Sequence, residues 1–136
     1  MLIDTLEKQH QELLEASGSI LAAMPDGEVF DAPAVRNLLL RFMGKLTVHL
    51  VTEDEQVYPT LLNHKDSQVR ATTERLRSEL GGLAQAVDKY KAIWTSVVSI
   101  QKQPAEFTHH TRLLLAALAK RIQQEDEELY VLLKRP

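Results

Sequence analysis

Apolar side chains recur along the chain in steps of three and four residues, which is the spacing of one face of an α-helix. The most regular of these stripes consists of Leu76, Leu80, Leu83, Val87, Tyr90, Trp94 and Val97. Comparable stripes begin at Ile3, Leu38 and Leu114. The pattern therefore predicts four amphipathic helices, each with one stripe of side chains to bury.

Prolines and loop-forming residues separate the predicted helices at residues 25–33, 59–67 and 103–104. Pro59 is expected to kink or end the second helix near its tail. Short connections between four helices favour an antiparallel up-down-up-down four-helix bundle. We therefore expect an all-α fold in which residues 1–136 form a single domain.

The composition narrows the class of protein further. The chain has 136 residues, enough for one domain with one core, and only five glycines and five prolines, which argues against a turn-rich β fold. It has no cysteine, which excludes disulfides, iron–sulfur clusters, thiolate zinc and thiol catalysis. The formal net charge is -3 and no basic stripe lies on a predicted face, so nucleic acid is not an expected partner.

Two segments indicate where the protein resides. The first residues, MLIDTLEKQHQELLEA, are acidic and amphipathic and lack the basic and apolar regions of a signal peptide. The apolar run from Leu113 to Leu118 is far shorter than the roughly 20 residues needed to span a bilayer. We therefore expect a cytoplasmic protein with no membrane partner.

Ionisable side chains interrupt the apolar stripes of three predicted helices. His10 lies on the core face of the first helix, and His49 and Glu53 lie on the core face of the second. Arg121 and Glu125 lie on or beside the stripe of the fourth. Within each pair the two residues are four positions apart and share a helix face. A lone histidine there is usually a hydrogen-bonded core residue, but a set from three helices indicates a shared site.

The two halves of the chain repeat one pattern. The second helix has the sequence HLVTEDEQVYPTLL from His49 and the fourth has RIQQEDEELYVLL from Arg121, so the string EDExxY recurs. The sequences of the first helix (LEKQHQELLEA) and the third (LRSELGGLAQA) align in the same way, and His10 then aligns with Leu80. The second half therefore keeps its carboxylate but has leucine and arginine where the first half has histidines.

The strings EKQHQELL, HLVTEDEQVYP and EDEELY resemble the hemerythrin-like, or HHE cation-binding, family over nearly the whole chain. Members of that family form a four-helix bundle that typically holds a di-iron centre bridged by two carboxylates. The resemblance implies four metal ligands in this chain: His10, His49, Glu53 and Glu125. It also puts Leu80 and Arg121 where the family supplies further histidines, so we do not expect a conventional di-iron oxygen carrier.

Two carboxylates that face each other in a bundle core need a compensating charge. At about 4 Å they repel by about 4 kcal/mol for an effective dielectric of about 20, and desolvation adds to this. One solution is a single divalent ion (iron, manganese or zinc) on His10, His49 and Glu53, with or without Glu125. Another is the permanent charge of Arg121, with no metal at all. The two can coexist, and a dinuclear site with other ligands is a third reading.

Three classes of function follow. The first is a metal-binding protein that senses a gas or redox state through a small diatomic ligand, and the second is a metal-free interaction or regulatory module with a protein partner. An enzyme ranks last, because the chain has no phosphate loop, nucleophile motif or recognisable substrate pocket. His64, His109 and His110 are not expected to complete the site, and Trp94 and the tyrosines are expected to be packing residues. The sequence leaves the oligomeric state, the metal and the partner open.

Overall fold

The computed structural model describes residues 2–135, and its regular elements over these residues are all helical. The first half contains α1 (Leu2–Ala22), the 3-10 turn η1 (Pro25–Gly27), α2 (Ala32–Thr52), the π-helical segment η2 (Glu53–Val57) and α3 (Tyr58–Leu62). The second half contains α4 (Ser67–Leu80), α5 (Leu83–Trp94), α6 (Val97–Lys102), α7 (Pro104–Gln124), the π-helical segment η3 (Glu125–Tyr130) and α8 (Val131–Leu133). The predicted all-α class is confirmed.

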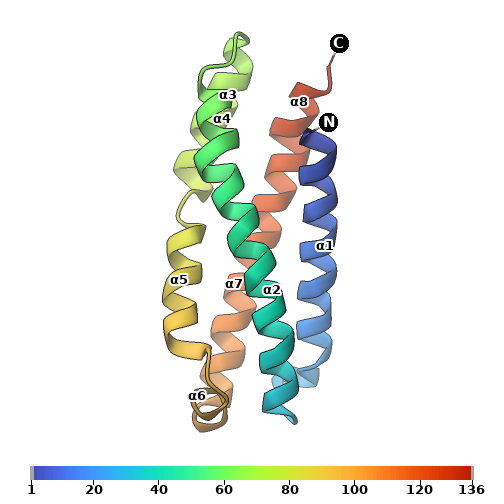
Figure 1. Cartoon of the computed structure of the whole chain (residues 1–136), viewed down its shortest axis with the longest axis vertical. Helices are drawn as coiled ribbons and strands as arrows, with labels where there is room; N and C mark the ends of the chain where they lie inside the picture. Colours follow the sequence, from blue (N-terminus) through green and yellow to red (C-terminus); the bar gives the residue numbers. More distant parts are fainter. Residues whose placement is uncertain (1, 136) are drawn as a thin grey trace.

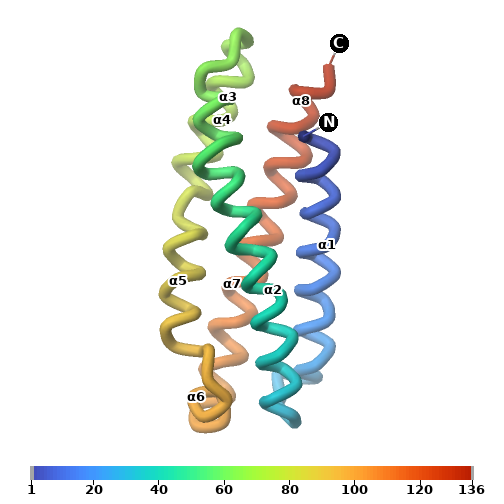
Figure 2. Tube along the Cα trace, in the orientation of Figure 1, coloured from blue at the N-terminus to red at the C-terminus, as the bar shows by residue number. Residues whose placement is uncertain are grey.

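The long helices lie lengthwise beside one another in an elongated molecule (Figure 1). α1 packs along α2 and also contacts α7, while α5 contacts both α2 and α7. The Cα trace brings the first and last described residues to the same end of the molecule (Figure 2). Within the described part of the chain, no helix is both long and apolar enough to cross a membrane.

The apolar core consists of two clusters with ionisable side chains between them. On α1, His10 lies between Leu6 of one cluster and Leu13 of the other. The second and fourth helical runs have the same order around their buried carboxylates, with Leu50 and Ile122 in one cluster and Val57 and Leu129 in the other. We call the buried ionisable residues between the clusters the polar layer; they are His10, His49, Glu53, Arg121 and Glu125.

Two helix boundaries bear on the sequence prediction. Pro59 lies in the first turn of α3, directly after η2, and the second helical run ends shortly after it at Leu62. The prediction of one continuous third helix is wrong. The third helical run is interrupted at Gly81–Gly82, and its second part, α5, ends at Trp94. The Ser96 side chain then caps the separate helix α6 by accepting a hydrogen bond from the Ser99 backbone N–H (3.1 Å).

Candidate metal centre

The polar layer brings together the four residues expected to bind a metal. His10 comes from α1, His49 from α2, and Glu53 and Glu125 are the first residues of the two π-helical segments. All four are buried, and each offers one ligand atom such that these atoms lie within 4.8 Å of one another. This group could hold a metal ion.

His10 lies between three carboxylates. Its Nε2 is 3.3 Å from Glu53 Oε2 and 3.2 Å from Glu125 Oε1, and its Nδ1 is 2.7 Å from Asp126 Oδ1. Burial alone would lower the pKa of His10, but the hydrogen bonds to Asp126 and the two glutamates outweigh it and raise the pKa to about 11. A metal ion bound at Nε2 would therefore have to displace a proton from His10.

His49 has a free ligand atom. Its Nδ1 lies 2.7 Å from Gln9 Oε1, and because an amide oxygen only accepts, Nδ1 carries the hydrogen and Nε2 presents a lone pair. Nε2 lies 3.2 Å from Glu53 Oε1 but makes no well-aligned hydrogen bond among the described residues, and Glu125 Oε1 has only its 3.2 Å ion-pair contact with His10 Nε2. Buried acceptors without donors are unfavourable, and a bound cation would satisfy both.

Arg121, from α7, contacts both carboxylates and is 1% exposed. Its Nε donates to Glu125 Oε2 and its Nη2 to Glu53 Oε1, both at 3.1 Å, and Nη2 also donates to Asp54 Oδ1 at 2.7 Å. Its Nη1 donates to the backbone oxygen of Leu80 at 3.4 Å. Burial alone would lower the pKa of Arg121, but the two glutamates raise it above its usual value. The guanidinium therefore supplies a permanent positive charge to both carboxylates.

Two tyrosine hydroxyls donate to the carboxylates crosswise between the halves. Tyr58, which follows Glu53, donates to Glu125 Oε2 at 2.5 Å, and Tyr130, which follows Glu125, donates to Glu53 Oε2. Burial and the charge of Glu53 raise the pKa of Glu125 to about 7. Burial would also raise the pKa of Glu53, but hydrogen bonding, with that from His10 as the largest contribution, holds it well below its usual value. The centre thus holds one clearly ionised carboxylate and one that protonates more readily.

The sequence reasoning missed several residues that contact the centre. Asp54 and Asp126 directly follow the two glutamates in the EDE strings, and each reaches a residue of the other half, Arg121 and His10 respectively. The recurring EDE strings could have pointed to Asp54 and Asp126 as equivalent residues of the two halves. The tyrosines are buried, as expected of packing residues, but the hydroxyls of Tyr58 and Tyr130 also donate to the carboxylates. Nothing in the sequence pointed to Gln9.

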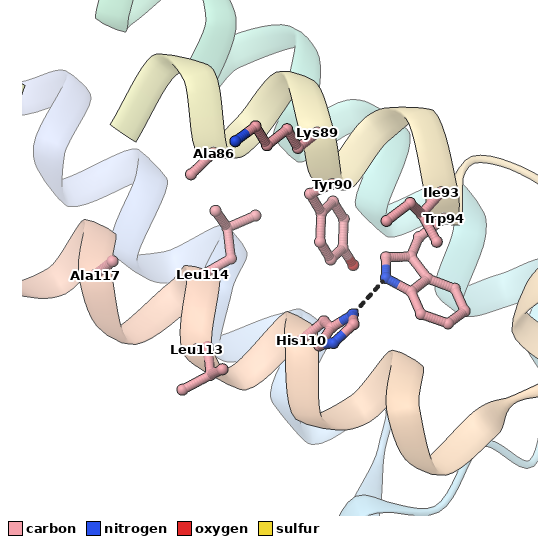
Figure 3. Close-up of a pocket in the computed structure, with 9 residues that line it drawn as sticks. All are labelled: Ala86, Lys89, Tyr90, Ile93, Trp94, His110, Leu113, Leu114 and Ala117. Carbon is pink, nitrogen blue, oxygen red and sulfur yellow. Dashed lines mark hydrogen bonds between the residues drawn. The ribbon is translucent and has the colours of Figure 1, made fainter. Parts of the chain in front are cut away.

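The other three histidines lie away from this centre. His64 Nδ1 accepts a hydrogen bond from the Asp66 backbone N–H, and His109 is exposed. His110 Nδ1 accepts a hydrogen bond from Trp94 Nε1 (3.1 Å) beside an apolar pocket of about 320 Å³ between α5 and α7 (Figure 3). None of the residues that line this pocket belongs to the polar layer.

Helical proteins build metal sites from histidines and glutamates on facing helices, and the described residues bring such side chains together here. More particularly, the chain belongs to the hemerythrin family, because the family model of the hemerythrin HHE cation-binding domain matches residues 1–133. No curated protein and no solved structure matches the chain. The family match confirms the resemblance seen in the sequence strings.

The residues present fit one metal ion but not two. Two histidines and two carboxylates, including two acceptor atoms that make no well-aligned hydrogen bond among the described residues, suit a divalent ion such as iron, manganese or zinc. In the second half Leu80 has no side-chain donor atom, and the Arg121 guanidinium already binds both carboxylates. A second cation there would meet a fixed positive charge.

Proposed function

We propose that this protein is a degenerate hemerythrin-family protein, a metal-binding or sensing protein whose centre holds at most one divalent metal ion. The proposed ligands are His10, His49, Glu53 and Glu125. We further propose that residues 1–136 form a single antiparallel up-down-up-down four-helix bundle and that the protein works in the cytoplasm. A conventional di-iron oxygen carrier is not part of this proposal.

The contact of Arg121 with both carboxylates carries the proposal. Nε and Nη2 each lie 3.1 Å from a different glutamate, so one side chain supplies the charge that a second metal would otherwise supply. The Nε2 of His49 and Oε1 of Glu125, which make no well-aligned hydrogen bond among the described residues, support a first metal. The first half of the repeat would then bind the metal ion, and the second half would supply a permanent positive charge.

A divalent ion bound there would supply a Lewis-acidic position for a small diatomic ligand. The protein's own residues would orient and shield that position. Asp126 and Gln9 fix the rings of His10 and His49, while the Tyr58 hydroxyl orients Glu125 by donating a hydrogen bond to its Oε2. The two apolar clusters on either side of the polar layer exclude bulk water from it.

The second candidate is a metal-free interaction or regulatory module that binds a protein partner. The observation that favours it is the charge balance, because Arg121 and a protonated His10 oppose Glu53 and Glu125 without any ion. In this case the bundle would serve only to present its surface.

Metal content tests the two candidates. Protein purified without chelators or affinity metal, then offered Fe(II), Mn(II) or Zn(II), should bind no more than one ion per chain by elemental analysis. Aerobic protein loaded with iron should lack the charge-transfer bands of an oxo-bridged diferric centre. Two irons per chain with those bands would overturn the proposal, and no bound metal under any condition would select the metal-free candidate.

A restored half-site gives a sharper version of this test. The double variant Leu80→His with Arg121→His replaces the apolar and cationic side chains by two ligands, and it should bind a second metal ion. The matched control is Leu80→His alone, which keeps the guanidinium and should not gain a second ion. Equal metal content in both variants would contradict the role assigned to Arg121.

A further inference from the structure

Two surface pockets of similar size occupy equivalent places in the two halves of the chain. One, of about 310 Å³, lies between α1 and α2, and its lining includes Gln9 and Val48. The other, of about 290 Å³, is lined in part by Glu79 and Lys120. When His10 is aligned with Leu80, and the second helical run with the fourth as in the EDExxY repeat, Gln9 matches Glu79 and Val48 matches Lys120. The pockets are therefore counterparts in the internal repeat.

Only the first of these two pockets reaches the polar layer. His49 lines it, although the residue is only 2% exposed, and its opposite ring nitrogen lies beside Glu53. In the second pocket the counterpart of His49 is Arg121, which is drawn inward onto the carboxylates and is not part of the lining. Glu79, the counterpart of Gln9, pairs instead with Arg75 at the surface (3.5 Å).

We propose that the pocket between α1 and α2 is the route by which a metal ion reaches and leaves the centre, and that Gln9 is the positioning residue for His49. This inference rests on the proposed function, since it assumes that one metal binds. Gln9 and His49 both line the pocket, and their side chains are hydrogen-bonded at 2.7 Å.

The role of Gln9 follows from the chemistry of the imidazole. Only one nitrogen of a neutral histidine carries a hydrogen, and the Gln9 oxygen holds that hydrogen on Nδ1. The lone pair is then on Nε2, which is the atom that faces the carboxylates. Gln9 is only half-buried, and this is its one hydrogen bond among the described residues, so its amide can move aside without disturbing either apolar cluster.

The rim of the pocket also suits an arriving cation. Glu12 and Lys45 lie on opposite walls and form a loose ion pair of 3.9 Å between two exposed side chains. Such a pair is weak and exchanges readily with water. Its opening would offer the Glu12 carboxylate to a hydrated divalent ion directly above Gln9.

Co(II) binding, followed by its visible absorption, tests the role of Gln9. Gln9→Leu should weaken Co(II) affinity by about 10–100-fold, the usual effect of losing such a supporting hydrogen bond. Gln9→Glu keeps the acceptor and should retain the affinity. In the metal-free proteins, ¹⁵N NMR should show His49 protonated at Nδ1 in the unaltered chain and in Gln9→Glu, but not predominantly so in Gln9→Leu. Unchanged affinity or an unchanged tautomer in Gln9→Leu would refute the assignment.

Filling the pocket tests the route. A side chain at Gly44, which lines the pocket, would meet no atom within 4 Å of its Cβ, so Gly44→Leu should fold and obstruct the pocket. Transfer of Co(II) to a chelator should slow by about tenfold, a barrier increase of about 1.4 kcal/mol, with little change in affinity. The matched control is Gly82→Leu, which is equally free of close atoms and lies in the counterpart pocket, and it should leave the rate unchanged.

The outcomes separate this inference from the proposed function. If the unaltered protein binds no Co(II), both the proposed function and the route are overturned. If it binds Co(II) but Gly44→Leu and Gly82→Leu exchange it at the rate of the unaltered protein, only the route is overturned.

Discussion

The Arg121 guanidinium reaches Glu125 and Glu53 through two different nitrogens, and Asp54 accepts a further hydrogen bond from Nη2. An arginine in place of a histidine ligand is therefore more than the loss of a metal-binding group. It replaces an exchangeable cation by a covalently attached one that cannot lose its proton. The carboxylates stay paired whether or not a metal is present.

Replacing Arg121 tests how strongly the stability of the folded protein depends on its charge in the polar layer. Arg121→Leu leaves buried carboxylates without their cation, which typically costs about 3–5 kcal/mol. We expect this loss in the metal-free protein at pH 7, measured by urea unfolding. Arg41→Leu, an exposed position on α2, is the control and should change stability little. A neutral effect of Arg121→Leu would mean that the guanidinium does not pair with the carboxylates.

The same variant should become more stable, relative to the unaltered protein, as the pH falls towards about 7. The pKa of Glu125 is already raised from its ordinary 4.5 to about 7 by burial and by Glu53, and removal of the arginine would raise it further. The folded state then holds a proton that the unfolded state has lost, so the free energy of unfolding falls as pH rises above about 4.5. Below about pH 7 both folded proteins carry this proton, so the deficit of Arg121→Leu that comes from Glu125 should grow as the pH rises above about 7 and shrink as it falls back to about 7. A deficit that does not vary with pH above about 7 would contradict this reasoning.

Removal of the proposed histidine ligands tests the retained half-site. His49→Ala and His10→Ala should each remove most of the bound metal, because each deletes one of two nitrogen ligands. His109→Ala, at an exposed position outside the polar layer, is the control and should leave the metal content unchanged. Elemental analysis of the three variants gives the answer, and normal metal content in both His10→Ala and His49→Ala would refute the ligand assignment.

At the scale of the elements, the π-helical segments determine how the tyrosines meet the carboxylates. Each segment begins at a buried glutamate, and five residues later comes a tyrosine, Tyr58 after Glu53 and Tyr130 after Glu125. In an α-helix, residues five apart point about 140° away from each other. The wider π turn, in which the Tyr58 N–H bonds to the Glu53 oxygen, turns both side chains inward. The segment η3 forms the same kind of turn without a proline, so the turn does not depend on Pro59.

The break between α4 and α5 yields a prediction from two adjacent glycines. A Cβ on Gly81 would lie 2.4 Å from the backbone oxygen of Arg77, whereas one on Gly82 would meet nothing within 4 Å. Gly81→Ala should therefore lower the free energy of unfolding, while Gly82→Ala should be neutral or stabilising by about 0.4–1 kcal/mol. Thermal unfolding of the pair checks this, and equal effects at the two positions would contradict the steric argument.

At the scale of the whole molecule, the two apolar clusters enclose the polar layer and bury all three tyrosines. Burial raises the pKa of Tyr58, Tyr90 and Tyr130 above the ordinary value of 10.0. In the folded protein each hydroxyl keeps a proton that the unfolded chain loses near pH 10. The free energy of unfolding should therefore fall as pH rises above about 10.

This burial should make tyrosine ionisation and unfolding coincide. In an alkaline titration, tyrosinate absorbance should stay low until the helical circular dichroism signal is lost, and then all three tyrosines should ionise together. Protein in concentrated urea provides the reference and should titrate near pH 10. Ionisation of even one tyrosine while the helical signal is intact would show that its hydroxyl reaches solvent.

The amino-acid sequence by itself determined the helical class, the internal repeat and the five residues that meet in the polar layer. These depend on spacing, because an α-helical period fixes which residues share a face. Only the tertiary structure decided what those residues contact. The pairing of Arg121 with Glu53, the crosswise tyrosines and the hydrogen bond of Gln9 to His49 join residues far apart in the chain. The π turns that aim the tyrosines break the α-helical period, so no pattern based on that period could have predicted them.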